Sequence, residues 1–267
     1  MSLGIVIKGP EGLVLAAESR LTLTATPPNA PPLHVGFDNA TKVFGFGAPN
    51  SAVGVVTYGA GAIGLRSAYS LVPEFEAQLP AEQLAVAEFA DNLSAFYLQQ
   101  WQNIVGPNHQ GPGMTFVVAG FNEAEAYGRV FLIEVPNAPQ RQERSPGTEF
   151  GITWGGQQEI VTRLVMGYDP RVLPAVQSAL GLNFTPQQTA DLQAALQLLA
   201  MQMPLPAMSL QDCVDLAIFF VKTTIEAQRL SVGVRGCGGP IDIAVVTRQG
   251  GLSFVQQKKV RGETTTV

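Results

Sequence analysis

Ser2 is the residue whose type and position best suit nucleophilic chemistry. The small side chain after Met1 favours removal of the methionine, which leaves Ser2 with both a hydroxyl and a free α-amine. The α-amine of such a residue can act as the general base for its own hydroxyl. Its ordinary pKa of about 7.7–8.0 is already close to neutrality, and a neighbouring ammonium group lowers it further. Ser2 is therefore a candidate N-terminal nucleophile.

Two other features have residue types that suggest chemistry. Residues 59–64 have the GxGxxG spacing of a dinucleotide-binding turn. That fingerprint requires a second parallel strand ending in an acid, whereas here a second helix is expected, so we favour a tight glycine turn and keep dinucleotide binding as the weakest alternative. Cys237 has only Arg235 as a neighbouring activator, so we expect a packed or loop cysteine rather than a reactive thiol.

The composition excludes several other classes of catalytic and binding site. The chain has two cysteines without a CxxC motif and two histidines, His34 and His109, which we expect in loops. These numbers exclude a disulfide framework, a zinc ligand set and catalytic centres that need several histidines. The net charge of −5, without a basic cluster longer than residues 258–261, argues against nucleic acid as a partner. We expect no metal and no cofactor.

The elements that position Ser2 begin immediately after it. Leu3–Lys8 is apolar and β-branched, residues 9–12 have turn chemistry, and residues 13–17 form a second apolar run. This pattern predicts a β-hairpin. The hairpin would hold Ser2 at a sheet edge and return residues 18–20 beside it.

The rest of the chain predicts one domain, residues 1–267, of segregated strands and helices. The expected strands span residues 3–8, 13–17, 41–47, 52–58, 114–120, 129–135, 150–153, 241–247 and 252–256. The expected helices span residues 60–79, 81–104 and 209–230, with an interrupted helical region from residue 157 onward, and loops cover residues 24–40 and 136–147. Such an order is typical of antiparallel sheets covered by helices.

Length and hydrophobicity indicate a soluble chain. No apolar run reaches 18 residues, and the N-terminus lacks the basic region of a signal peptide, so we expect a cytoplasmic protein. Only 14% of residues are charged, against roughly 25% in an average domain. Either the surface is rich in Gln and Thr, or much of it is buried against other subunits.

Four segments, in order, resemble proteasome-type β subunits. Residues 13–20 are similar to the family's strand that ends in an acid and an arginine, and residues 39–44 to the segment that holds its active-site lysine, here Lys42. Residues 58–61 resemble its glycine turn, and residues 241–248 its late strand. The chain is thus identified as a divergent member of the bacterial proteasome-like type.

The resemblance covers residues 2–120 and returns at about residues 153–167 and 212–256. It implies an α+β fold, the four-layer αββα sandwich of N-terminal nucleophile (Ntn) hydrolases, with two antiparallel sheets and flanking helices. It also implies self-assembly into a ring or stacked rings. A peptide is the implied substrate, and any unfoldase partner stays unspecified.

The implied activity is peptide hydrolysis by Ser2 without a cofactor. By resemblance, Lys42 pairs with Glu18 and lowers the pKa of the α-amine, while the backbone N–H of Gly59 donates to the oxyanion. The sixteen residues from Ser2 to Glu18 match the family's spacing between nucleophile and acid. Arg20 is expected to hold the end of the hairpin rather than to take part in chemistry.

Three departures from the family pattern keep other functions open. At Gly155 the chain lacks the family's serine, after Leu230 it lacks the family's aspartate, and the nucleophile is serine rather than threonine. An inactive subunit that shapes a ring is the first alternative. A small-molecule amidase on the same fold is the second.

A helical insertion at about residues 168–208 lies where the resemblance lapses, and a polar tail covers about residues 258–267. Residues 172–211 contain one charge, Asp191, in forty positions. An exposed helix normally has a charged outer face. We therefore expect this segment to pack against a neighbouring subunit, the alternative being that its own domain covers it.

Overall fold

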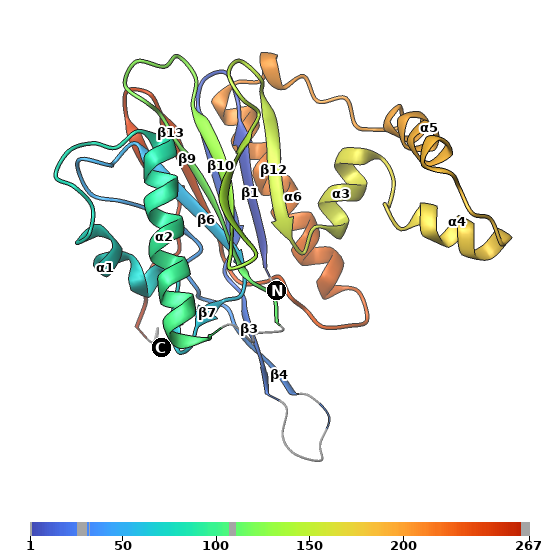
Figure 1. The fold of residues 1–267 in the computed structure, drawn as a ribbon, viewed down its shortest axis with the longest axis horizontal. Helices are drawn as coiled ribbons and strands as arrows, with labels where there is room; N and C mark the ends of the chain where they lie inside the picture. The colour runs from blue at the N-terminus through green and yellow to red at the C-terminus, as the bar shows by residue number, and fades with distance from the viewer. Residues whose placement is uncertain (1, 26–30, 32, 107–110, 263–267) are drawn as a thin grey trace, which may run out of the picture.

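The chain folds as a mixed α/β protein with two five-stranded antiparallel sheets (Figure 1). The computed structural model describes residues 2–25, 31, 33–106 and 111–262. Among these residues, no helix combines the length and the hydrophobicity that a membrane crossing requires.

The first sheet joins the two ends of the sequence. Across the sheet, its strands are β12 (Gly151–Gly156), β1 (Leu3–Lys8), β2 (Leu13–Glu18), β13 (Ile241–Thr247) and β14 (Gly251–Gln256). Every residue of β1 and β2 is buried, which explains their continuous apolar runs. The turn between them closes with a hydrogen bond from Gly9 N to Gly12 O at 3.0 Å.

The second sheet is built from the middle of the chain. Its strands, in order, are β11 (Ala138–Arg144), β10 (Arg129–Val135), β9 (Met114–Gly120), β6 (Val53–Gly59) and β5 (Val43–Gly45). The strands expected at residues 114–120 and 129–135 have the predicted bounds. Their β-branched and aromatic residues suit a pleated, buried surface.

The two sheets pack against each other through an apolar cluster. Its buried residues come from both sheets and include Leu15, Ala244, Val56 and Val117. Two further clusters lie on the other faces of the sheets and hold the helices. Both faces of each sheet therefore contribute to the hydrophobic core.

One long helix covers each outer face. Helix α2 (Val86–Ile104) buries Phe89, Leu93 and Tyr97 against the second sheet. Helix α6 (Leu210–Arg229) buries Val214 and Phe220 against the first sheet, beside α3 (Glu159–Met166).

The start of α6 agrees with the sequence. Ser209 accepts a hydrogen bond from Asp212 N, and the Asp212 carboxylate accepts one from Ser209 N, which is a capping box. Helix α6 is expected at residues 209–230, close to its observed bounds. Helix α2 is expected at residues 81–104, but the observed helix begins five residues later.

The helix expected at residues 60–79 is wrong over most of its length. The segment contains β7 (Ala62–Ile63), β8 (Arg66–Ser67) and the 3-10 turn η1 (Tyr69–Leu71), and the helix α1 (Val72–Glu76) is only five residues long. Gly59 and Gly64 have φ angles of +90° and +60°. Such left-handed conformations interrupt a right-handed helix, so the glycine turn does not open one.

Two expected loops contain strands. Residues 24–40 include parts of a ribbon, β3 (Leu21–Ala25) paired with β4 (Leu33–Phe37), which projects from the body of the molecule (Figure 1). Residues 136–147 include β11, an edge strand whose residues are mostly exposed. Strand β11 lacks the alternation of a half-buried strand, whereas β3 alternates Leu and Thr but leads into a segment whose four prolines favour a loop. His34 thus lies in β4, while His109 falls outside the described residues.

Most of residues 168–208 lies beside the body, although Leu173 and Leu205 are buried. The segment contains α4 (Val172–Leu180), α5 (Pro186–Gln197) and the 3-10 turn η2 (Leu205–Ala207), and Figure 1 shows α4 and α5 projecting outward past α3. Helix α5 has no buried residue. The alternative that its own domain covers the whole segment is therefore wrong.

Candidate active site

A buried ion pair joins the end of β2 to the residue before β5. Lys42 Nζ donates a hydrogen bond to Glu18 Oε1. The side chains of Lys42 and Glu18 are 6% and 0% exposed. Taking two charges out of water is costly, so such a pair persists only where further hydrogen bonds hold it.

Three backbone amides hold the Glu18 carboxylate. Leu3 N donates to Oε1 at 3.2 Å, and Arg20 N and Gly238 N donate to Oε2 at 2.6 and 3.0 Å. The donors come from β1, from the residues after β2 and from the segment before β13. Backbone amides from three separate parts of the chain therefore fix Glu18, and Glu18 in turn holds Lys42.

Burial changes the acid–base chemistry of Lys42. Burial lowers the pKa of its ammonium group, while the charge and hydrogen bond of Glu18 oppose that shift. Its ammonium also donates to Arg20 O at 2.5 Å. Glu18 and the Arg20 carbonyl thus hold the Lys42 amine in one place inside the protein.

Ser2 lies next to this pair, at the start of β1. It is buried, and its carbonyl accepts a hydrogen bond from Gln157 N at 2.6 Å. Ser2 and Lys42 line one cavity of about 20 Å³ with Thr57, Tyr58 and Gly61. A cavity of this volume has room for about one water molecule. The remaining lining residues are Leu21, Ala40, Thr41, Ala60, Ser67 and Ala68.

Gly59 borders this cavity without lining it. Ala60 N donates to Gly113 O at 2.8 Å on the β9 side of β6, and Thr57 N donates to Lys42 O at 2.9 Å on the other side. Because amides alternate sides along a strand, the amide of Gly59 faces the Lys42 side. A Cβ at Gly59 would lie 2.4 Å from Gly113 O, and its φ of +90° disfavours any other residue.

Arg20 fastens the β3–β4 ribbon to the site. Its Nε and Nη2 donate to the two carboxylate oxygens of Asp38 at 2.5 and 2.6 Å. The paired Arg20 lowers the pKa of Asp38, and the hydrogen bond raises the pKa of Arg20. The guanidinium also lies over Gly238, where a Cβ would be 2.5 Å from Arg20 Cζ. These contacts agree with the structural role expected for Arg20.

Two glutamines occupy the region where the family's serine and aspartate are missing. Gln228 Nε2 donates to Gln157 Oε1 at 3.0 Å, and Gln228 Oε1 accepts from Cys237 N at 2.8 Å. The backbone amide of Gln157 donates to the carbonyl of Ser2, so this chain of contacts extends to Ser2. The sequence analysis missed both residues, because no motif distinguishes them from other glutamines.

Tyr58 takes the space in which a side chain at position 155 would stand. A Cβ built at Gly155 would lie 2.3 Å from the Tyr58 hydroxyl oxygen. Burial raises the pKa of Tyr58 to about 12, so its phenol stays protonated at neutral pH. The ring of Tyr58 thus packs over Gly155, the position at which the resemblance implies a serine.

The other candidate chemistries find little support in the geometry. Cys237 is buried, and burial raises the pKa of its thiol, so the reactive thiolate is disfavoured. The glycine turn leads into β7 rather than into a helix, so it lacks the amide-lined helix start of a dinucleotide site. Within the described ranges, no three His, Cys, Asp or Glu residues are placed to hold a metal ion.

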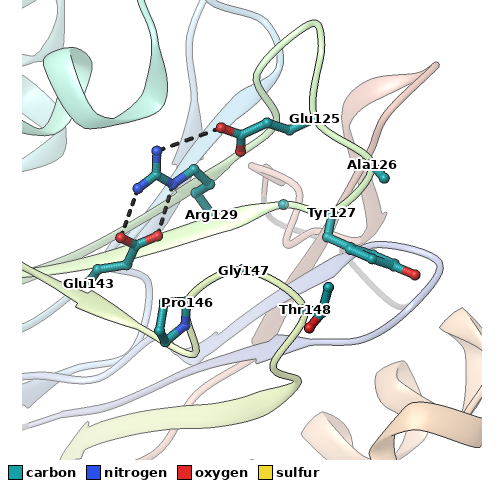
Figure 2. A pocket seen from close by; sticks show the side chains of 9 residues that line it. Glu125, Ala126, Tyr127, Arg129, Glu143, Pro146, Gly147 and Thr148 are labelled. Atoms are coloured by element: carbon teal, nitrogen blue, oxygen red, sulfur yellow. Dashed lines mark hydrogen bonds and ion pairs between the residues drawn. The ribbon is translucent and has the colours of Figure 1, made fainter.

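A cavity of about 360 Å³ near the far end of β1 contains a group of ion pairs (Figure 2). Arg129 donates to both carboxylate oxygens of Glu143, at 2.8 and 2.7 Å, and lies 3.7 Å from Glu125. Behind it, Lys8 Nζ donates to Ser145 O and Gly147 O. These charges hold the loop before β12.

Comparison with known proteins supports the fold. No family model matches the sequence, and no curated protein matches it. Among solved structures, the chain is similar to the Anbu (Gly-1) mutant from Hyphomicrobium sp. strain MC1, with a TM-score of 0.56 and 14% identity. The match covers 97% of this chain and 87% of that chain. At this identity the similarity shows that the two chains share a fold.

Proposed function

We propose that this chain is a proteasome-like peptidase whose nucleophile is Ser2 after removal of the residue that precedes it. The observation that carries the proposal is the buried Lys42–Glu18 pair beside a cavity that Ser2 also lines. Burial lowers the pKa of Lys42, and a charged group with a perturbed pKa at a cavity is a candidate functional residue. The proposed fold is the αββα sandwich of Ntn hydrolases, with α2 and α6 as its outer layers.

The proposed reaction has two steps. The α-amine of Ser2 takes the proton from Oγ as Oγ attacks the peptide carbonyl, and it then gives the proton to the leaving amine, leaving an acyl ester on Ser2. Water, deprotonated by the same amine, attacks the ester and releases the second peptide and the free hydroxyl. This is the nucleophile-and-base chemistry of an activated hydroxyl.

Lys42 and Gly59 support these steps. The Lys42 ammonium lowers the pKa of the nearby α-amine and so favours its neutral, proton-accepting form. Glu18 keeps Lys42 charged and in place. The amide of Gly59 donates to the oxyanion, a contribution of about 2.7–4 kcal/mol for one such donor.

A catalytically inactive subunit is the second candidate function. The Gln157–Gln228 contact favours it, because these amides stand where the family has a serine and an aspartate. An amide neither takes nor gives a proton at neutral pH, so this part of the site offers no acid–base group.

We also propose that copies of the chain assemble into a ring. Helix α5 has no buried residue, and the segment after it exposes Leu198 and Leu199 by 82% and 61%. Exposed apolar residues gathered on one segment indicate a partner surface.

Peptide hydrolysis by wild type and the Ser2→Ala variant tests the proposal. We expect wild type, whose intact mass shows a chain starting at Ser2, to cleave fluorogenic peptides. The Ser2→Ala variant should lose at least 100-fold in kcat/KM with an unchanged unfolding temperature, and Ser2→Thr should keep activity. Undiminished hydrolysis by Ser2→Ala would overturn the mechanism. Folded, assembled wild type without hydrolysis would favour the inactive subunit.

A further inference from the structure

Another cavity, of about 560 Å³, adjoins the β3–β4 ribbon. It lies on the opposite face of the ribbon from the small cavity that Leu21 and Ser2 line. Thr22, His34 and Gly36 from the ribbon form one wall, and the segment between α6 and β13, with Gly233 and Arg235, forms the other. Successive residues of a strand point to opposite faces, so Leu21 and Thr22 belong to different cavities. The volume is in the range of small-ligand sites.

The polar groups of this cavity are incompletely used. Arg20, at its edge, bonds to Asp38 through Nε and Nη2, while its Nη1 reaches only Arg235 O at 3.5 Å. In the described part of the chain, the Arg235 guanidinium makes no hydrogen bond or ion pair.

The charges in the cavity select the class of ligand. Arg20 and Arg235 contribute two positive charges, and Asp38 removes one, so the balance of these three groups is one positive charge. A singly charged carboxylate matches this balance, whereas a phosphate dianion leaves a negative charge uncompensated. A guanidinium fork also suits the two oxygens of a carboxylate.

We propose that this cavity binds a carboxylate, either from a small organic acid or from the C-terminus of a peptide. Arg235 binds one or both oxygens of the carboxylate. Arg20, already held by Asp38, adds its remaining amine hydrogens. The site is separate from the cavity at Ser2 and needs no catalytic group.

The two walls of this cavity are also the segments that hold the catalytic ion pair. Arg20 N and Gly238 N both donate to Glu18 Oε2, and Lys42 Nζ donates to Arg20 O. A carboxylate bridging Arg20 and Arg235 therefore draws together the two segments whose amides fix Glu18.

Binding is tested apart from catalysis, on the Ser2→Ala protein. Titration calorimetry with acetate, with a short peptide bearing a free C-terminus and with the same peptide amidated separates the two sources. We expect saturable binding that falls at least 10-fold in Arg235→Gln. Arg248→Gln, which changes an arginine outside this cavity, should bind as before.

The outcomes are distinct. Acetate binding equal to that of the acid peptide indicates a small organic acid, and preference for the acid over the amidated peptide indicates a peptide terminus. Equal heats for acetate and chloride at matched ionic strength, or unchanged binding in Arg235→Gln, would overturn the site. Because Ser2→Ala has no nucleophile, binding in this variant stands even where the hydrolysis proposal fails.

Discussion

At the scale of single residues, the account depends on a lysine that is charged inside the protein. Lys42→Met keeps the length of the side chain and removes the ammonium, so the pKa of the Ser2 α-amine should rise. We expect kcat/KM at pH 7 to fall by about 100-fold, the lower end of the range for general-base catalysis. Activity should recover partly at higher pH, because the amine then loses its proton without help.

A pH–rate profile of the Lys42→Met protein checks this expectation, with the exposed tail variant Lys259→Met as the control. The substitution leaves Glu18 buried and unpaired, at a cost of about 3–5 kcal/mol in the free energy of unfolding. Adding Glu18→Gln should restore part of this stability without restoring activity. A Lys42→Met profile that coincides with wild type would contradict the assignment of Lys42.

For Arg20→Ala we expect the opposite, a clear loss of unfolding free energy and only a small change in the rate of hydrolysis. Arg20→Ala removes the two hydrogen bonds to Asp38, and we expect a loss of about 1–2 kcal/mol in unfolding free energy for this partly exposed pair. Turnover per folded molecule should fall less than threefold. Denaturant unfolding measures the free energy of unfolding, and hydrolysis kinetics on the same preparation give the turnover per folded molecule.

The pH dependence of this pair follows from Asp38. Arg20 lowers the pKa of Asp38 in the folded state, so the folded protein binds this proton less readily than the unfolded chain. The stabilisation is present above the ordinary pKa of 3.8 and is lost as the pH falls through the lowered value. The stability difference between wild type and Arg20→Ala should therefore shrink below pH 3.8. A difference that grows on acidification would be inconsistent with the pair.

At the scale of elements, Gln228 in the last turn of α6 connects the helix to the nucleophile's strand. Gln228→Leu removes the bond to Gln157 and leaves the Cys237 amide without its acceptor. We expect about 1–3 kcal/mol less stability and slower peptide hydrolysis. Gln193→Leu, on the exposed α5, should change neither quantity. Thermal unfolding together with kinetics tests this, and full stability in Gln228→Leu would show that the contact is dispensable.

The sequence predicts the buried strands well, because continuous apolar runs between turns have few other solutions. It fails at β11, whose mostly exposed residues show no alternation. It also fails at the β3–β4 ribbon, where apolar and polar residues alternate but the four prolines of residues 24–40 favour a loop. It also fails at residues 60–79, where local apolar spacing favours a helix but the left-handed glycines decide the backbone. Each failure concerns a segment in which tertiary context outweighs periodicity.

The candidate site was predictable only where residue type and chain order are informative. The spacing of Ser2 and Glu18 in a hairpin, and the resemblance at Lys42, identify groups that the fold does bring together. Gln157 and Gln228 are far apart in sequence and meet only when α6 packs on the first sheet. Their contact has no sequence signal.

At the scale of the whole molecule, the exposed apolar end of the insertion predicts self-assembly. Leu198→Glu with Leu199→Glu places two charges where the monomer leaves both side chains exposed, so the fold should persist. We expect light scattering to show species smaller than those of wild type. Leu230→Glu, at another exposed leucine, should leave the mass unchanged. An unaltered assembly in the folded double variant would exclude this surface as the interface.

The central claim is that the hydroxyl of Ser2 is the nucleophile, and covalent labelling tests it most directly. The wild-type protein is treated with a hydroxyl-directed electrophilic peptide inhibitor, and the adduct is mapped by mass spectrometry of its proteolytic fragments. The account predicts one adduct, on a fragment that begins at Ser2, and none in the Ser2→Ala or Lys42→Met proteins at neutral pH. An adduct on another residue, or on a fragment that still carries Met1, would contradict it.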